Sequence, residues 1–156
     1  MNRIHCRRVH TDADWLAARY IRQRVFVEEQ ECPPEEEWDA YDKPEARGVT
    51  CYHLLGFIAG APVAVARWRP VEVRDETMAK LERFAVLPGA RGHGLGRAMV
   101  AAALRDARAA GFGVFVLHAQ AHLEGFYASF GFRPVSEPFD EAGIPHVKMV
   151  RRDAEG

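Results

Sequence analysis

"AVLPGARGHGLGRAMVAAAL", residues 85–104, sets a glycine-rich segment between an apolar run and a long alanine-rich run. Its four glycines are Gly89, Gly92, Gly94 and Gly96. Glycine inside a helix or strand lowers stability by roughly 0.5–1 kcal/mol, so four glycines so close together favour a loop. Such a loop uses their backbone freedom and their lack of side chains. The stretch predicts a strand, this loop, and a helix from about Gly94 to Ala110 that ends at Gly111. Because the first N–H groups of a helix lack intrahelical partners, the loop is a candidate phosphate-binding site.

Phosphate-binding glycine loops differ in their signatures. A P-loop needs a lysine directly after its glycines, and none follows here. A dinucleotide-binding loop needs G-x-G-x-x-G and a following strand that ends in an acid. Here Arg97 stands at the third glycine position, and the next predicted strand ends at His118. The remaining pattern, R-x-x-G-x-G, matches Arg91 to Gly96, with a glycine-rich turn that binds no ligand as the alternative.

Length and composition limit the class of protein. At 156 residues the chain is expected to form one domain, residues 1–156. Its formal net charge of −1 predicts neither a nucleic-acid nor a membrane partner. The N-terminal MNRIHCRR lacks the apolar segment of a signal peptide, and the longest apolar stretch is broken by His53, Gly60 and Pro62. Three cysteines without C-x-x-C spacing indicate reduced thiols, so a cytoplasmic protein is expected.

Hydrophobic periodicity predicts a mixed α/β (α+β) chain built on one sheet. The predicted strands cover 3–9, 79–86, 114–118 and 146–150, and a hairpin covers 51–70 around Ala59-Gly60-Ala61-Pro62. The predicted helices run from Thr11 or Asp12 to about residue 27, from about 94 to 110, and from about 120 to 130. Residues 28–50, rich in Glu and Pro, are expected to be irregular or partly helical.

Four further stretches together resemble one protein family. They are IRQRVFVEEQECPPEEEWD (21–39), KLERFAV (80–86), HAQAHLEGFYASFGF (118–132) and AGIPHVKM (142–149). With the R-x-x-G-x-G loop they are similar, in content and order, to the bacterial ElaA/YjcF-like branch of the GNAT superfamily of N-acetyltransferases. The resemblance implies the GNAT acyl-CoA N-acyltransferase fold, a mixed and mostly antiparallel twisted sheet flanked by helices. It also implies transfer of the acetyl group of acetyl-CoA to a primary amine of a small-molecule acceptor.

The same resemblance implies that acetyl-CoA binds along the strand before the loop and at the loop itself. The pantetheine arm is expected to lie beside that strand as an added strand does. A backbone N–H near Ala85 or Val86 is the expected donor to the oxyanion. The expected cofactor-binding residues are Phe84, Ala85, Val86, Arg91, Gly92, His93, Gly94, Leu95, Gly96, Arg97 and Tyr127.

Catalysis needs a base, because an alkyl amine has a pKa of roughly 10.4 and is protonated at neutral pH. Glu82 is the first candidate, since strict strand alternation puts it on the same face as Phe84. His118 and His146, at strand ends, are the alternates, and Tyr127 is the expected acid for the leaving thiolate. Each also has a structural interpretation: a surface ion pair, hydrogen-bonded histidines, and a core aromatic ring.

The acceptor is less well determined. Residues 28–42 hold eight carboxylates and no Lys or Arg, which favours a cationic amine but is also typical of a solvated loop. The candidate acceptor-binding residues are Arg24, Glu29, Arg67 and Arg69. If the last two face the cleft, the acceptor carries a carboxylate or phosphate as well as its amine. His118 and His122 have i,i+4 spacing, but a predicted strand–helix break separates them, so no metal is expected.

Family resemblance alone implies a homodimer. A transferase that uses another acyl-CoA is one alternative to acetyl transfer. The other is a catalytically silent CoA-binding sensor or interaction protein that keeps the glycine loop and lacks a productive acceptor site.

Overall fold

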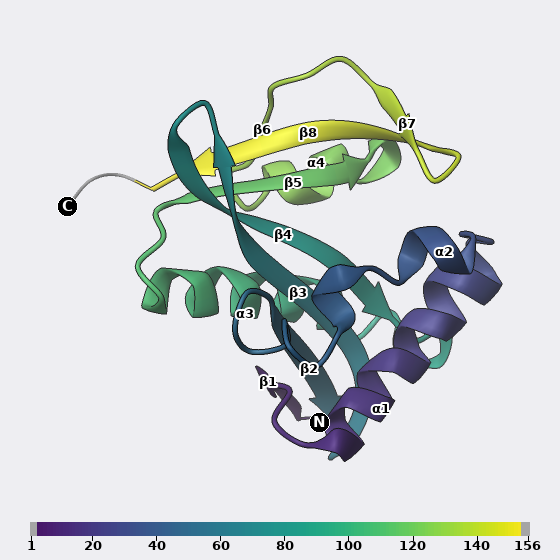
Figure 1. The fold of residues 1–156 in the computed structure, drawn as a ribbon. Coiled ribbons are helices and arrows are strands. Elements are labelled where there is room, and N and C mark those ends of the chain that lie inside the picture. Colours follow the sequence, from purple (N-terminus) through teal and green to yellow (C-terminus); the bar gives the residue numbers. More distant parts are fainter. Residues whose placement is uncertain (1–2, 154–156) are drawn as a thin grey trace.

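The computed structural model describes residues 3–153, and its strands form one eight-stranded sheet (Figure 1). The strands are β1 (Ile4–Arg8), β2 (Tyr52–Ile58), β3 (Ala61–Val73), β4 (Glu76–Val86), β5 (Val114–Gln120), β6 (Arg133–Pro134), β7 (Phe139–Glu141) and β8 (Ile144–Arg152). Their order is β1-β2-β3-β4-β5-β8-β6, and β7 pairs with β8. Every pairing is antiparallel except β4 with β5, which is parallel. The predicted mixed, mostly antiparallel sheet is confirmed.

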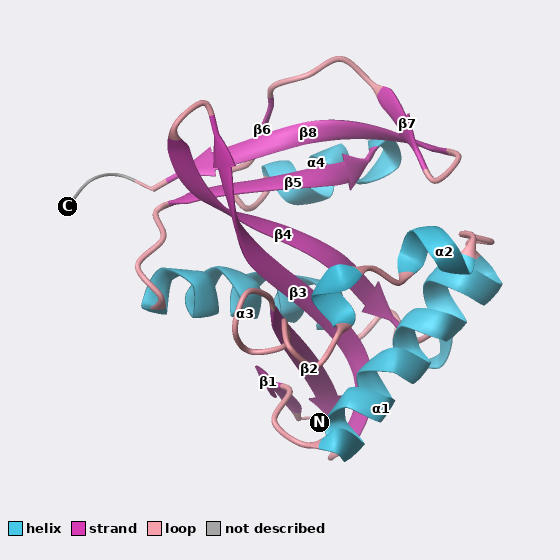
Figure 2. Ribbon diagram, viewed as in Figure 1, coloured by secondary structure: helices cyan, strands magenta, loops and turns pink. Residues whose placement is uncertain are grey.

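Helices cover both faces of this sheet (Figure 2). On one face α1 (Asp12–Arg22) packs Ala18 and Ile21 against Leu55 of β2 and Val65 of β3. On the other face, α3 (Leu95–Ala109) and α4 (Glu124–Ala128) share a larger core with the sheet. The largest buried side chains of that core include Trp68, Phe115, Phe132, Leu95 and Met99. In residues 3–153 no helix is long and apolar enough to cross a membrane.

The first helix begins where the sequence predicts. The Thr11 side chain accepts a hydrogen bond from the Asp14 backbone N–H, and the Asp14 carboxylate accepts from the Thr11 N–H. This reciprocal cap satisfies two N–H groups that a helix start leaves free. After α1 the chain continues as a wider π-helical segment, η1 (Gln23–Glu29), and then as the short α2 (Pro34–Glu37) and η2 (Ala40–Asp42). Residues 30–42 are called the lid below.

β4 and β5 separate soon after they meet. Their parallel pairing is confined to Ala79 with Phe115 and Lys80 with Val116, whereas β4 stays paired with β3 as far as Val86. Within residues 3–153, the edge of β4 that faces β5 therefore has no strand partner from Leu81 onward. Figure 1 shows β5 and β8 diverging from β3 and β4 on this side. The result is a V-shaped opening in the sheet.

A β-bulge accompanies the separation. The register of β3 with β4 shifts between Val65 and Arg67, and Arg83 adopts a φ of 60° that non-glycine residues rarely occupy. The expected alternation of Glu82 with Phe84 on one face is therefore wrong. Leu81 and Phe84 both contact the core on the α3 side, and Glu82 lies on the opposite face. The extra residue of the bulge reverses the alternation beyond Arg83.

The remaining elements follow the predictions with shifted ends. The hairpin turns at Ala59-Gly60, β5 extends to Gln120, and β8 spans 144–152 rather than 146–150. The helix predicted over 120–130 is shorter: residues 121–123 form a 3-10 turn, and α4 ends at Ala128. Gly131, with a φ of 87°, follows as the chain turns toward β6.

Candidate active site at the opening between β4 and β5

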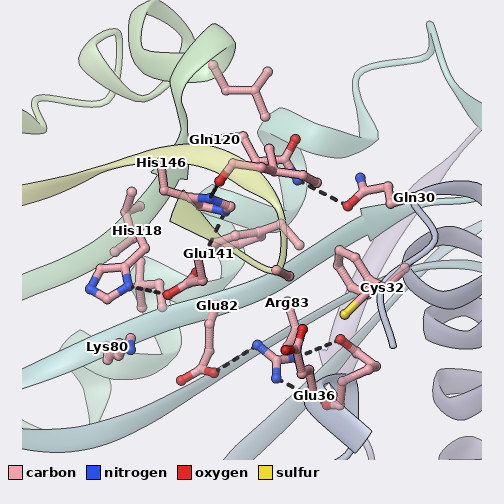
Figure 3. Close-up of a pocket in the computed structure, with 18 of the residues that line it drawn as sticks. Gln30, Cys32, Glu36, Lys80, Glu82, Arg83, His118, Gln120, Glu141 and His146 are labelled. Atoms are coloured by element: carbon pink, nitrogen blue, oxygen red, sulfur yellow. Dashed lines mark hydrogen bonds and ion pairs between the residues drawn. The ribbon is translucent and has the colours of Figure 1, made fainter. Parts of the chain in front are cut away.

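A cavity of about 510 Å³ lies at the opening between β4 and β5. Its walls come from β4, β5, the β7–β8 hairpin, α4 and the lid (Figure 3). The polar and aromatic side chains that line it include Gln30, Cys32, Glu36, Arg69, Lys80, Glu82, Arg83, Phe84, His118, Gln120, Tyr127, Glu141 and His146. Gln120 donates to the Gln30 side chain at 3.1 Å, which ties β5 to the lid across the cavity.

The glycine loop forms the N-terminus of α3. Gly92 and Gly94 have φ values of 87° and 85°. Apart from their chain neighbours, no atom of residues 3–153 lies within 4 Å of where a Cβ would stand on either. Gly94 is the N-cap of α3 and has no side chain to cap the first N–H groups. A Cβ on Gly96 would meet only Phe126 Cζ, at an ordinary 3.7 Å. Protein packing thus gives no reason for glycine at 96, and the space above the helix start is open.

Charged side chains flank this loop. Arg91 donates to the Val86 carbonyl at 3.0 Å and to the Glu29 carboxylate at 2.9 Å. Arg97 donates to Ser129 at 3.2 Å and lies over the Phe130 ring. Both arginines are exposed enough to turn toward an anion at the helix start. Among the expected cofactor residues, His93 and Leu95 belong to the same turn, where His93 is exposed and Leu95 is buried in the core.

A network of ion pairs connects the lid to β3 and β4, on the face of the sheet opposite to α3. Arg67 of β3 is 1% exposed and donates to Asp39 and Asp42 of the lid and to Glu82 of β4. Nearby, Arg22 of α1 is equally buried and pairs with Glu37 and Asp42. No local sequence pattern indicates this network, because its members are far apart in the chain.

Glu82 is a fixed member of that network. Its Oε2 accepts from Arg67 at 2.7 Å and its Oε1 accepts from Arg69 at 2.8 Å. Burial opposes its ionisation, but the charges of Arg67, Arg69 and Arg83 outweigh burial and lower the pKa of Glu82 to about 2. With such a pKa, Glu82 is a weak proton acceptor near neutral pH. The geometry favours the structural interpretation of this residue over the predicted base.

The two candidate histidines converge on one carboxylate. His118 Nδ1 is 2.9 Å from Glu141 Oε1, and His146 Nε2 is 3.6 Å from Glu141 Oε2 (Figure 3). His146 Nδ1 also hydrogen-bonds the Ile144 carbonyl at 2.7 Å, so both of its nitrogens face protein atoms. The hydrogen bond with His118 lowers the pKa of Glu141. No local sequence pattern indicates a role for Glu141, which the β7–β8 pairing brings to His118 of β5.

Tyr127 is both a packed aromatic residue of the core and a residue of the cavity wall. Its ring packs in the core near Phe84 and Phe132, and the residue also lines the cavity. Burial raises the pKa of its phenol, which therefore stays protonated at neutral pH. Within residues 3–153 its hydroxyl has no hydrogen-bond partner, so the proton is free to be donated to a ligand.

The four predicted acceptor-binding residues do not lie together in the structure. Only Arg69 lines the cavity. Arg24 pairs with Glu28 at the surface, and Glu29 is held by Arg91. Arg67 is enclosed by its carboxylate partners. Direct acceptor contacts of Arg24, Glu29 and Arg67 are therefore not supported, because their charged groups are already engaged in ion pairs with other side chains.

A family model for the acetyltransferase (GNAT) domain matches residues 52–152, which include β4, the glycine loop and the cavity. The chain belongs to the GNAT acetyltransferase family. YjcF of Bacillus subtilis, named an uncharacterized N-acetyltransferase, is 36% identical over 135 residues, covering 86% of this chain and 89% of YjcF. ElaA of Escherichia coli is also 36% identical over 132 residues, covering 84% of this chain and 82% of ElaA. Both matches confirm the resemblance to the ElaA/YjcF-like branch.

Solved structures agree with this GNAT assignment. The crystal structure of E. coli ElaA superposes with a TM-score of 0.79 at 30% identity, covering 97% of this chain and all of ElaA. YncA of Salmonella typhimurium, crystallised with acetyl-CoA, shares the fold with a TM-score of 0.77 at 19% identity, covering 99% of this chain and 96% of YncA. In residues 3–153 of the present chain, no group of three or more His, Cys, Asp or Glu side chains is arranged to hold a metal ion.

The ion network predicts loss of stability in acid. The folded-state pKa of Glu82, about 2, lies below its ordinary 4.5, so its pairing stabilises the fold above pH 4.5 and is lost as pH falls toward 2. Asp42, with a pKa also lowered to about 2 despite burial, adds to the same trend. Glu82 is expected to contribute on the order of 3 kcal/mol to the free energy of unfolding at neutral pH. Urea unfolding at pH values from 7 to 2.5 measures how this free energy declines.

Glu82→Gln should lower stability at pH 7, because Arg67 and Arg69 lose a buried partner, and should flatten the decline between pH 4.5 and 2. Glu28→Gln removes one exposed ion pair and is the matched control. An equally steep decline in wild type and Glu82→Gln would show that Glu82 does not carry the effect.

Proposed function

We propose that the protein is an acetyl-CoA-dependent N-acetyltransferase that acts on a primary amine of a small-molecule acceptor. The observation that carries the proposal is the opening between β4 and β5, because it joins an unpaired strand edge to the cavity. The bare helix start of α3 follows that strand after the glycine loop. A first test mixes purified protein with acetyl-CoA, or with longer acyl-CoAs, and a panel of amines, and follows the release of free thiol. No thiol release from any combination would contradict catalysis.

The residues around the helix start suit the diphosphate of coenzyme A. The open space at Gly92, Gly94 and Gly96 admits a ligand close to the backbone, where the N–H groups of the first turn of α3 are available. Arg91 and Arg97 add positive charge on either side. YncA, which was crystallised with acetyl-CoA, has the same fold, and this supports the choice of donor.

The unpaired edge of β4 suits the amide-rich pantetheine arm. Within residues 3–153, Phe84, Ala85 and Val86 have no strand partner on the β5 side, where the Val86 carbonyl accepts from Arg91. The backbone groups that remain on this edge are able to hydrogen-bond an extended ligand as a neighbouring strand would. A backbone N–H near Ala85 or Val86 is the proposed donor to the developing oxyanion. Bound acetyl-CoA supplies the activated thioester.

We assign the base to His118. It lines the cavity, and its Nδ1 is held by Glu141, which leaves Nε2 as the nitrogen that accepts a proton. Glu141 fixes the ring and favours the imidazolium that forms. Glu82 is a weaker choice, because both of its oxygens accept from arginines and its pKa is about 2. His146 is also weaker, because both of its ring nitrogens face protein atoms.

We assign the acid to Tyr127. Tyr127 lines the cavity, and its phenol remains protonated at neutral pH, so it is a suitable donor to the leaving thiolate. A free thiol has a pKa near 8.5, so this proton contributes only modestly to the rate.

The alternatives to this proposed function are a transferase for another acyl group and a CoA-binding sensor without turnover. A single domain over 1–156, a homodimer and a cytoplasmic location stay predictions.

Gly96→Ala tests the diphosphate site without strain. The added methyl group has room among protein atoms and favours the helix by about 1 kcal/mol, so thermal stability should hold or rise. It also occupies the space assigned to the ligand, so acetyl-CoA affinity by calorimetry should fall at least tenfold. Gly113→Ala, at an open position away from the loop, is the matched control. Unchanged affinity in Gly96→Ala would remove the proposed site.

Tyr127→Phe tests the acid. The ring and its packing remain, so acetyl-CoA affinity should stay close to that of the wild type, while kcat should fall by roughly ten- to a hundredfold. Thiol release under saturating acetyl-CoA measures kcat. Tyr52→Phe removes a phenol that donates only to the Val49 carbonyl near the surface, and it is the matched control. Wild-type turnover in Tyr127→Phe would exclude the acid role.

His118→Asn tests the base. The kcat should fall by roughly a hundredfold, and the dependence of the rate on pH should change, because the amine loses the group that takes its proton. Thiol release between pH 5.5 and 9 measures both. His122→Asn replaces an exposed histidine four residues away, outside the cavity lining, as the control. A pH profile unaltered by His118→Asn would move the role to another group.

A further inference from the structure

Most charged side chains that line the cavity already have partners. Glu37 and Asp39 pair with arginines of the ion network, and so does Glu82. Glu141 is held between the two histidines. Within residues 3–153, two charged lining side chains have no ion pair: Glu36 of α2 and Lys80 of β4. In the view of Figure 3 they lie on opposite sides of Glu82.

Lys80 stands directly opposite another cation. Arg69 of β3 is its register partner on β4, so the two side chains share one face of the sheet. Arg69 donates a hydrogen bond to Glu82 through its Nε. Within residues 3–153 the two terminal nitrogens of Arg69 have no hydrogen-bond partner. Like charges placed opposite each other on paired strands are destabilising. The carboxylates of Glu82 and Glu141 offset part of this repulsion at Lys80. An anion between Lys80 and Arg69 would offset more of it and bind both groups.

We propose that Lys80 and Arg69 form an anion subsite, and that the acceptor is an amine that also carries a carboxylate or phosphate group. This inference rests on the proposed N-acetyltransferase function. It narrows the acceptor to amino-acid-like or phosphorylated amines and disfavours simple polyamines. Burial lowers the pKa of Lys80, so a bound anion also favours its charged form.

The two unpaired charges give the acceptor a direction. Lys80 belongs to the last β4–β5 pair, at the closed end of the opening. Arg83, three residues further along β4, donates to the Glu37 carbonyl, so α2 and its Glu36 lie over the later part of the strand. The thioester is assigned to this later part, because the proposed oxyanion donor is a backbone N–H near Ala85 or Val86. An acceptor with its anion on Lys80 therefore extends its amine toward Glu36 and the acyl group.

Substrate pairs that differ by one anionic group test the subsite. Lysine with cadaverine, phenylalanine with phenethylamine, and phosphoethanolamine with ethanolamine form such pairs, and the last distinguishes phosphate from carboxylate. Thiol release gives kcat/KM for each amine, and calorimetry gives binding without turnover. In at least one pair the anionic member should be favoured tenfold or more. Lys80→Met should reduce that preference by roughly 10- to 100-fold, as expected for loss of one charge-assisted hydrogen bond.

Two further variants separate recognition from folding. Lys80→Arg keeps the charge and should retain the preference, while Lys148→Met, a lysine of the same sheet outside the cavity lining, should leave it unchanged. Turnover without any preference for an anionic member, or a preference untouched by Lys80→Met, overturns the subsite. If no amine releases thiol but calorimetry shows the preference and its loss in Lys80→Met, the transferase function fails and the subsite stands.

Discussion

The parting of β4 from β5 is the constraint on which the rest of the site depends. Parallel pairing ends at Lys80 and Val116, although both strands continue for several residues. The bulge at Arg83 turns β4 while its antiparallel bonds to β3 continue to Val86. In a continuous sheet, the backbone groups on this edge of β4 would hydrogen-bond β5. The separation of the two strands leaves that edge without a strand partner within residues 3–153 and opens the cavity. A regular β4 would keep the fold but lose the place for an extended ligand.

The lid is held in position by electrostatics more than by apolar contacts. Its α2 helix has four residues, and Asp39 and Asp42 follow in a single 3-10 turn. Such short segments have little intrinsic stability. Arg67 and Arg22 anchor these segments from below with buried, hydrogen-bonded ion pairs. Breaking such pairs singly costs several kcal/mol, so the lid is rigid where its carboxylates meet these arginines.

Much of this architecture could be predicted from local sequence. The glycine loop, α3 and the start of α1 depend on neighbouring residues, and the structure places them close to where the sequence indicates. The bulge at Arg83 could not be predicted, because an arginine with positive φ has no local signature. Glu141 was missed for a related reason: only the β7–β8 pairing brings it to His118. Features set by distant contacts were the ones that sequence reasoning lost.

The acidic composition of residues 28–42 shows how pairing changes the meaning of charge. By sequence it favours a general attraction for cations. In the structure, Glu37, Asp39, Asp42 and Glu82 are matched by Arg22, Arg67, Arg69 and Arg83, so these groups largely cancel at the cavity wall. A ligand inside the cavity senses chiefly the charges that remain unpaired. Under the proposed function, selectivity for the acceptor is expected to depend on a few side chains of both signs, which a count of carboxylates in the segment does not predict.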